Sequence, residues 1–243
     1  MLPQPGHLYI VATPIGNLGD ITLRARDTLA AVDLIACEDT RHSGKLLAHL
    51  EIRKPLVSLH QHNEAMRSAQ LLAELAQGKS IAYISDAGMP GISDPGQRLV
   101  TACRAAHIPV EVIPGPSAVL TALIGSGFPA DAFYFGGFLP VKSSQRIRVL
   151  EAALDADESS IFFETPHRLD STLALLLRLA PDHLICVARE LTKKFEEYRR
   201  GPAREVAAHY LAHPAKGEIC LLIAGSDLPK WARPEPPAEP LLP

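Results

Sequence analysis

Short apolar runs alternate with longer amphipathic stretches through the first half of the chain. In the longer stretches the apolar residues recur at i, i+3 and i+4, which is the spacing of one helix face. We therefore predict strands at 8–12, 34–37, 55–59, 80–85 and 110–113, separated by helices at 22–31, 41–50, 63–77 and 95–106. Regular alternation of strand and helix predicts a mostly parallel sheet that is covered on both faces.

A second alternating set follows a proline-glycine-proline turn at 114–116. We predict helices at 117–126, 144–154, 167–180 and 203–212, and strands at 132–138, 159–164, 183–188, 196–200 and 218–224. This pattern is typical of an α/β protein with two α/β domains, for which we expect the boundaries 1–116 and 117–226. The tail at 227–243 contains six prolines and cannot form a packed element, so we expect it to be extended or disordered.

Composition and charge exclude several classes of protein. The 243 residues are 47% hydrophobic and 21% charged, which is typical of a globular chain. With 24 Lys and Arg against 27 Asp and Glu the net charge is −3, so nucleic acid could be held only by a local basic patch. The absence of a leader pattern and of a membrane-length apolar stretch predicts a cytoplasmic protein with no membrane partner. The four cysteines lie in apolar runs without ligand spacing, so we expect buried thiols and no metal site.

Ligands of parallel sheets bind at the carboxyl ends of the strands, and four loops at such positions have unusual sequences. The first loop, 12–20, places two glycines and a proline before a helix, which permits close approach to a ligand but is equally typical of an ordinary turn. The second loop, 37–43, gathers Glu38, Asp39 and Arg41. Asp39 or the following threonine could also simply cap the next helix.

The third loop, 85–96, reads SDAGMPGISDPG and combines three glycines, two prolines and two aspartates. Its second half, Ser93 to Pro95, predicts a helix cap with proline in the first turn. No structural role accounts for Asp86, whose carboxylate suits a ribose or a cationic group. The fourth loop, 114–118, is a rigid turn whose N–H groups suit a carboxylate or another polar group, or else it forms a hinge between domains.

Taken in this order, the loops resemble those of a known family. The most specific segments are SDAGMPGISDPG at 85–96, EDTR at 38–41 and ETPHR at 164–168. Further matching segments lie at 9–20, 114–117, 136–140, 189–197 and 216–218, so that the resemblance covers about residues 8–225. The chain is similar to the ribosomal RNA small subunit methyltransferase I family of the tetrapyrrole methylase superfamily.

The resemblance implies an enzyme that uses S-adenosylmethionine to methylate the ribose 2′-hydroxyl of a cytidine in 16S ribosomal RNA, at the decoding centre of the small ribosomal subunit. It also implies two α/β domains with the cofactor in the cleft between them, and a homodimer. By the same resemblance, the cofactor contacts are Pro14, Asp86, Gly88, Met89, Ser117, Ala118, Phe163, Glu164 and Ala188.

Methyl transfer to a ribose hydroxyl depends on in-line placement of the reacting atoms, and a base or a cation near the hydroxyl oxygen assists it. The candidates for that role are Glu38, Asp39, Arg41, Arg189, Glu190 and Lys193, and the sequence does not rank them. The charged residues at 189–197 are also consistent with a solvated, ion-paired surface.

Contact with RNA depends on how the fold distributes charge, because residues 141–201 hold ten Lys and Arg but also ten Asp and Glu. The candidate RNA contacts are Lys142, Arg146, Arg168 and Lys194. A structured substrate such as the assembled small subunit fits this modest basicity better than free RNA does. The aromatic stretch Phe128–Phe138 could form a partner face, although core packing is the simpler explanation.

Two other functions stay open at this point. A small-molecule tetrapyrrole (corrin or porphyrin) methylase would share the fold, although the EDTR and ETPHR segments favour the ribosomal RNA branch. A non-catalytic RNA-binding or assembly factor would be expected to have lost loop residues, and all four loops are intact.

Overall fold

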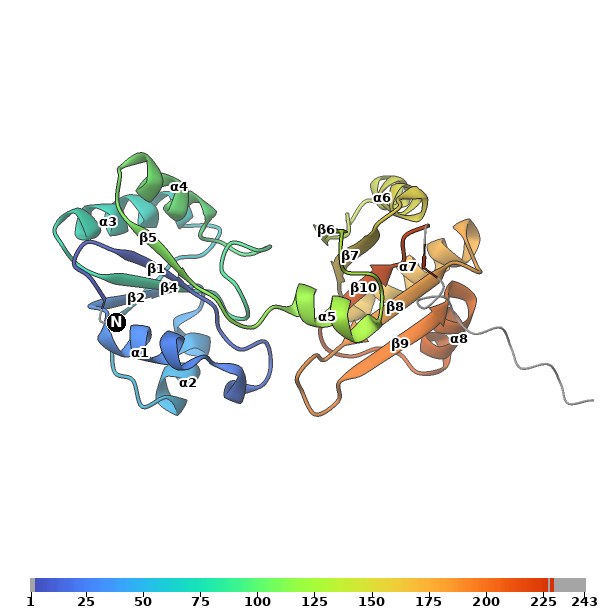
Figure 1. Ribbon diagram of the computed structural model, residues 1–243, viewed down its shortest axis with the longest axis horizontal. Helices are drawn as coiled ribbons and strands as arrows, with labels where there is room; N and C mark the ends of the chain where they lie inside the picture. Colours follow the sequence, from blue (N-terminus) through green and yellow to red (C-terminus); the bar gives the residue numbers. More distant parts are fainter. Residues whose placement is uncertain (1–2, 227, 230–243) are drawn as a thin grey trace, which may run out of the picture. The chain divides into compact units, whose positions relative to one another are not determined.

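Figure 1 shows the computed structural model of the protein, which describes residues 3–226 and 228–229. These residues divide into two compact units between Ser117 and Ala118. Each unit contains one five-stranded sheet together with helices, so the predicted α/β class is confirmed. The tail predicted at 227–243 lies outside the described residues, apart from positions 228 and 229.

The first unit is a parallel sheet with helices on both faces. Its strands pair in the order β3-β2-β4-β1-β5 and every pair is parallel, as predicted. The strands are β1 (Leu8–Val11), β2 (Leu34–Cys37), β3 (Leu56–Ser58), β4 (Ile81–Ile84) and β5 (Val110–Ile113). The helices are η1 (Leu18–Asp20), a 3-10 helix that was not predicted, α1 (Leu23–Ala31), α2 (Thr40–His49), α3 (Glu64–Ala76) and α4 (Gln97–Ala105).

Successive residues of each strand in this unit face opposite layers of helices. Leu8 and Ile10 of β1 pack with α3 and α4, whereas Tyr9 and Val11 pack with α1 and α2. Figure 1 shows these two pairs of helices on opposite faces of the sheet. Burial on both faces explains why β1, β2 and β4 are continuous apolar runs, whereas the edge strand β5 is partly exposed and includes Glu111. Because all strand pairs are parallel, the carboxyl ends of the five strands lie at one edge of the sheet.

The second unit is a mixed sheet in the order β6-β7-β10-β8-β9, in which β6 and β7 pair in parallel and the other neighbours are antiparallel. Helices α6, α7 and α8 share the main core, and α5 packs on β8, β9 and β10. The strands are β6 (Phe133–Phe138), β7 (Ser159–Glu164), β8 (Leu184–Arg189), β9 (Glu197–Pro202) and β10 (Ile219–Ile223). The helices are α5 (Ala118–Ser126), α6 (Ser143–Asp155), α7 (Pro166–Leu179) and α8 (Ala203–Ala212).

The start of α4 differs from the sequence prediction. The helix begins at Gln97, so the cap predicted at Ser93 to Pro95 is wrong. Gly96 precedes the helix with φ +119°, and a Cβ atom there would lie 2.4 Å from Cε1 of Tyr83. Glu64 of α3 supplies the cap instead, because its Oε1 accepts hydrogen bonds from the amides of Gly96 (2.8 Å) and Arg98 (3.3 Å).

The aromatic stretch 128–138 is only partly in the core. Phe128 is buried, but Phe133, Tyr134 and Phe138 of the edge strand β6 are 37%, 53% and 54% exposed, so core packing is wrong for these three. The expected burial of the cysteine thiols is confirmed, since all four are free and buried. No helix in the described part of the chain is long and apolar enough to span a membrane.

Candidate active site

The loops after β1 and β4 are joined by backbone hydrogen bonds. The amide of Thr13 donates to the carbonyl of Gly88 (2.9 Å), and the amide of Gly88 donates back to Thr13 (3.1 Å). Gly88 has φ +75°, a conformation that side chains rarely permit, and a Cβ atom there would approach Ile15 Cγ2 to 3.3 Å. The sequence therefore fixes the backbone around the predicted cofactor residues Pro14 and Asp86.

The loop after β5 packs against the same two loops. A Cβ atom on Gly115 would come within 2.9 Å of the Ala12 side chain, so a glycine is needed for this close approach. The carbonyl oxygen of Pro116 lies 3.8 Å from the position of a Cβ atom on Gly88. Three of the four loops chosen from the sequence, and with them Ser117 at the end of the unit, are thereby brought together at the carboxyl edge of the sheet.

The loop after β2 completes this edge through Asp39 and Glu38. The amide of Asp39 donates to Oδ1 of Asp86 (3.2 Å), and the amide of Asp86 donates to the carboxylate of Glu38. Asp39 also caps α2, accepting from the Arg41 amide (2.8 Å), and its Oδ2 lies 2.8 Å from the Arg41 guanidinium. These bonds from Arg41 hold the pKa of Asp39 well below its usual range. Both interpretations of Asp39, as a cap and as a member of a polar site, are compatible with this geometry.

Glu38 and Asp94 are the carboxyl groups at this edge whose pKa is raised. For Glu38 the largest cause is burial, followed by the negative charges of Asp94 and Asp86. For Asp94 burial again comes first and Asp86 adds to it, although a hydrogen bond with Ser85 opposes the shift. Asp94 lies in a loop that the sequence singled out, but its side chain was assigned to a helix cap. A carboxylate with a raised pKa suits proton abstraction near neutral pH.

In the second unit, the predicted residues gather around the start of β10. Phe163 of β7 and Ala188 of β8 flank Cys220 in the sheet register, and Glu164 and Arg189 flank Ile219 in the same way. Ala118, the first residue of α5, contacts the same strand, because its carbonyl accepts a hydrogen bond from Cys220 Sγ (3.8 Å).

Glu164 and Arg146 belong to a buried polar network. The Glu164 carboxylate accepts from the Thr165 amide and the Thr172 hydroxyl (both 2.8 Å), so it is not free to bind a cofactor. Arg146 is 7% exposed and donates to Ser171 (2.9 Å), to Thr172 (3.0 Å) and to the carbonyl of Val141 (3.3 Å). The structure therefore does not support Arg146 as an RNA contact. A buried cation must have internal partners, and the sequence did not indicate that this arginine faces the core.

Arg168 belongs to the same network, whereas the two candidate lysines do not. The Arg168 guanidinium donates to the carbonyls of Leu139 and Pro140 and lies 3.4 Å from Glu164. It is consequently engaged within the fold. Lys142 and Lys194 are exposed on the surface.

Arg189, Glu190 and Lys193 form ion pairs within the second unit. Nε of Arg189 lies 2.6 Å from Glu197, and Nζ of Lys193 lies 2.9 Å from both Glu190 and Glu218. Burial alone would lower the pKa of Lys193, but its two carboxylate partners raise the pKa above its usual value. The pairs Arg189–Glu197 and Lys193–Glu190 are only partly exposed, so they differ from the solvated surface weighed as the alternative.

Comparisons with known proteins agree with the loop pattern. A family model described as Tetrapyrrole (Corrin/Porphyrin) Methylases matches residues 7–207. The chain is 51% identical over 222 residues to "Ribosomal RNA small subunit methyltransferase I" of Synechocystis sp., covering 91% of this chain and 80% of the relative. It is 50% identical over 239 residues to the protein of the same name from Mesorhizobium japonicum, covering 98% and 80%. The chain belongs to the ribosomal RNA small subunit methyltransferase I family.

A solved structure of low sequence identity has the same fold. Uroporphyrin-III-C-methyltransferase from Thermus thermophilus matches with a TM-score of 0.64 and 22% identity, over 90% of this chain and 94% of that chain. At this identity the likeness concerns the fold alone. For the substrate of a ribosomal RNA small subunit methyltransferase I family member, the relatives in sequence carry more weight than this neighbour in fold.

The acidic edge of the first unit suits a cationic methyl donor. Glu38, Asp86 and Asp94 converge there, and the Arg41 cation is already paired with Asp39. The half-buried Met89 adds apolar surface in the same loop as Asp86, as a purine ring requires. Within residues 3–226 and 228–229, no group of three or more His, Cys, Asp or Glu is arranged to hold a metal ion.

Proposed function

We propose that this protein is a methyltransferase that transfers a methyl group from S-adenosylmethionine to the ribose 2′-hydroxyl of a cytidine in 16S ribosomal RNA, at the decoding centre of the small subunit. The observation that carries the proposal is identity of about one half, over more than nine tenths of the chain, to proteins named ribosomal RNA small subunit methyltransferase I. This favours an RNA substrate over a small tetrapyrrole.

Bound S-adenosylmethionine supplies the methyl group on a positively charged sulfur. Asp86 accepts hydrogen bonds from the cofactor, while Pro14, Gly88 and Met89 provide a fixed backbone and apolar surface. The acidic side chains around Asp86 attract the positively charged sulfur of the cofactor. The proposal keeps as further cofactor contacts Ser117, Ala118, Phe163, Ala188 and the backbone of Glu164.

Glu38 is the proposed general base for the ribose hydroxyl. Its carboxylate is half-buried and receives the Asp86 amide, so its orientation is fixed by the loop that holds the cofactor. Its raised pKa makes it a stronger base than an exposed glutamate. The Asp39–Arg41 pair then acts in positioning, because it ties the start of α2 to the same loop.

The remaining parts of the proposal concern the surroundings of the enzyme. Lys142 and Lys194 contact RNA, the protein forms a homodimer, and it acts in the cytoplasm, where small subunits are assembled. Light scattering of the purified protein tests the dimer directly.

The reaction is tested with labelled S-adenosylmethionine and small subunits that lack the modification. We expect label at one cytidine of 16S ribosomal RNA, with 2′-O-methylation mapped by reverse transcription at low nucleotide concentration. Label in a uroporphyrin or corrin precursor would show a small-molecule methylase. Binding to the small subunit without any methyl transfer would show an assembly factor.

The cofactor site is tested by Asp86→Ala. Loss of the carboxylate that accepts hydrogen bonds from the cofactor should abolish detectable binding of S-adenosylmethionine in calorimetry. Asp170→Ala, which removes an exposed carboxylate from α7, is the matched control and should bind like the wild type. Unchanged affinity in Asp86→Ala would refute the site.

A further inference from the structure

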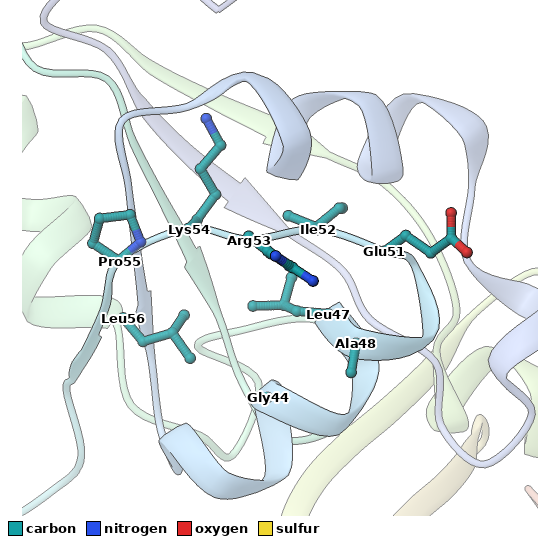
Figure 2. A pocket seen from close by; sticks show the side chains of 9 residues that line it. All are labelled: Gly44, Leu47, Ala48, Glu51, Ile52, Arg53, Lys54, Pro55 and Leu56. Atoms are coloured by element: carbon teal, nitrogen blue, oxygen red, sulfur yellow. The ribbon is translucent and has the colours of Figure 1, made fainter.

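A pocket of about 970 Å³ lies in the first unit, apart from the loops that form the candidate active site. Figure 2 shows that one wall is helix α2 at Gly44 and Ala48, and the other is the connection from α2 to β3. The connection contributes Arg53 and Lys54. The candidate RNA contacts from the sequence all lie in the second unit, so the sequence did not predict an RNA contact at this pocket of the first unit.

The connection is held rigidly at the end of α2. The amide of Glu51 donates to Ala48 (3.1 Å), and the amide of Ile52 donates to Leu47 (2.8 Å), which closes the helix end. Ile52 and Leu56 pack against the core on this side of the sheet. Arg53 and Lys54 are therefore presented from a fixed backbone, which lowers the entropy lost when they bind a ligand.

Arg53 is exposed and available to an anionic partner, whereas the charge of Lys54 also acts on Asp33. The pKa of Asp33 is lowered by hydrogen bonds from Ser80 and, to a smaller extent, by Lys54. Neither Arg53 nor Lys54 forms an ion pair with any residue in 3–226 or 228–229.

Glu51 also lines the pocket, but Figure 2 shows its side chain and that of Lys54 extending in different directions. The exposed Pro55 and the half-buried Leu56 provide some apolar surface beside the two charges. Cations presented at the surface match the phosphates of an RNA strand.

Gly44 has no explanation within the fold itself. A glycine in the interior of a helix destabilises it relative to other residues, yet a Cβ atom at Gly44 would meet nothing within 4 Å. The missing side chain instead leaves this part of α2 bare for close approach by a partner. Arg41, Gly44 and Ala48 share one helix face, so this face leads over about 10 Å from the Glu38 loop to the pocket.

We propose that the α2 face and the pocket with Arg53 and Lys54 bind the sugar-phosphate backbone of a single-stranded segment of the RNA substrate. This inference rests on the proposed function, since it extends the substrate contact away from the reacting nucleotide. The phosphates pair with the two cations, and the strand passes over Gly44 toward the loop that carries Glu38.

The charges are tested with the double variant Arg53→Ala/Lys54→Ala. We expect the KM for small subunits to rise about tenfold or more with kcat unchanged. The plot of log binding constant against log salt should become shallower by about 1.4, the value for two lost phosphate contacts. The control Arg24→Ala/Arg26→Ala removes two other exposed cations of this unit, both of them ion-paired, and should behave like the wild type. An equal loss in both variants would mean that bulk charge matters and would overturn the site.

The bare helix face is tested with Gly44→Gln, which fills the proposed path with a residue that favours helix. We expect a Tm equal to or above that of the wild type together with at least fivefold weaker binding of small subunits. Ala65→Gln on the exposed face of α3 is the matched control. Wild-type binding by Gly44→Gln would refute this inference alone, whereas absence of methyl transfer by the wild type itself would refute the proposed function.

Discussion

Glu38 combines two properties that oppose each other, reactivity and stability. Burial and the neighbouring aspartates raise its pKa, which means that the folded protein binds the Glu38 proton more tightly than the unfolded chain does. The stability associated with this group is therefore fully present below the unfolded pKa of about 4.3 and is lost as the pH rises through the higher, folded pKa. At neutral pH the ionised carboxylate weakens the fold, and the same ionised form is the one that can accept a proton.

We predict that Glu38→Gln lowers kcat about 100-fold or more and raises Tm at pH 7, with the difference in Tm disappearing near pH 4. In the wild type, activity should fall as the pH drops through the raised pKa. Asp94→Asn removes the nearby negative charge and should move this acidic limb to lower pH, whereas Asp170→Asn should not. A limb that stays in place in Asp94→Asn would exclude Glu38 as the base.

At this scale the sequence predicted which loops matter better than which side chains act. EDTR and SDAGMPGISDPG placed Glu38 and Asp86 at one sheet edge, because residue type and strand order suffice for that. The roles of Arg146 and Glu164 were not predictable, since they depend on which helix face turns inward and on Thr172, which lies far from Arg146 in sequence.

Among the elements, α6 and α7 are joined by a polar network and not by apolar contacts alone. Arg146 of α6 reaches Ser171 and Thr172 of α7, and Thr172 in turn holds Glu164 at the end of β7. The network fixes the strand end that carries Phe163. Such an arrangement is costly to break, because removing one member leaves other buried polar groups without partners.

We predict that Arg146→Ala lowers the free energy of unfolding by about 3 kcal/mol, measured by urea denaturation. The neighbouring surface variant Lys142→Ala should change stability by less than about 0.5 kcal/mol and should instead weaken binding of small subunits. The pair thus separates a structural arginine from an RNA-binding lysine on adjoining turns. Equal stability of the two variants would contradict the network's role.

The elements themselves followed closely from periodicity, apart from the 3-10 helix η1, which was not predicted, and the start of α4. Strands such as β2 and β5 were predicted to the residue, since runs bounded by turn residues mark strand ends well. The start of α4 was placed too early because Pro95 is a common first-turn residue. The actual cap comes from Glu64 in another helix, and no local pattern can reveal a cap that is formed by tertiary structure.

For the molecule as a whole, the net charge of −3 limits how RNA can be held. Four cations are proposed to contact phosphates, namely Lys142, Lys194, Arg53 and Lys54. At about 0.7 counterions released per contact with a single strand, log K should fall with log salt with a slope of only about −3. So shallow an electrostatic contribution cannot distinguish the target from other RNA, and shape must supply the rest of the affinity.

We therefore predict that assembled small subunits are methylated with a kcat/KM at least tenfold above that for free 16S ribosomal RNA, at about 0.15 M salt. Lowering the salt should narrow the difference, because non-specific attraction then grows for both substrates. The control is a short RNA with the target sequence, which presents the same phosphates without the subunit's shape. Equal kcat/KM for this RNA and for the assembled subunit would mean that local sequence and charge suffice, and a steep salt slope near −8 would mean that many more cations than these four face the RNA.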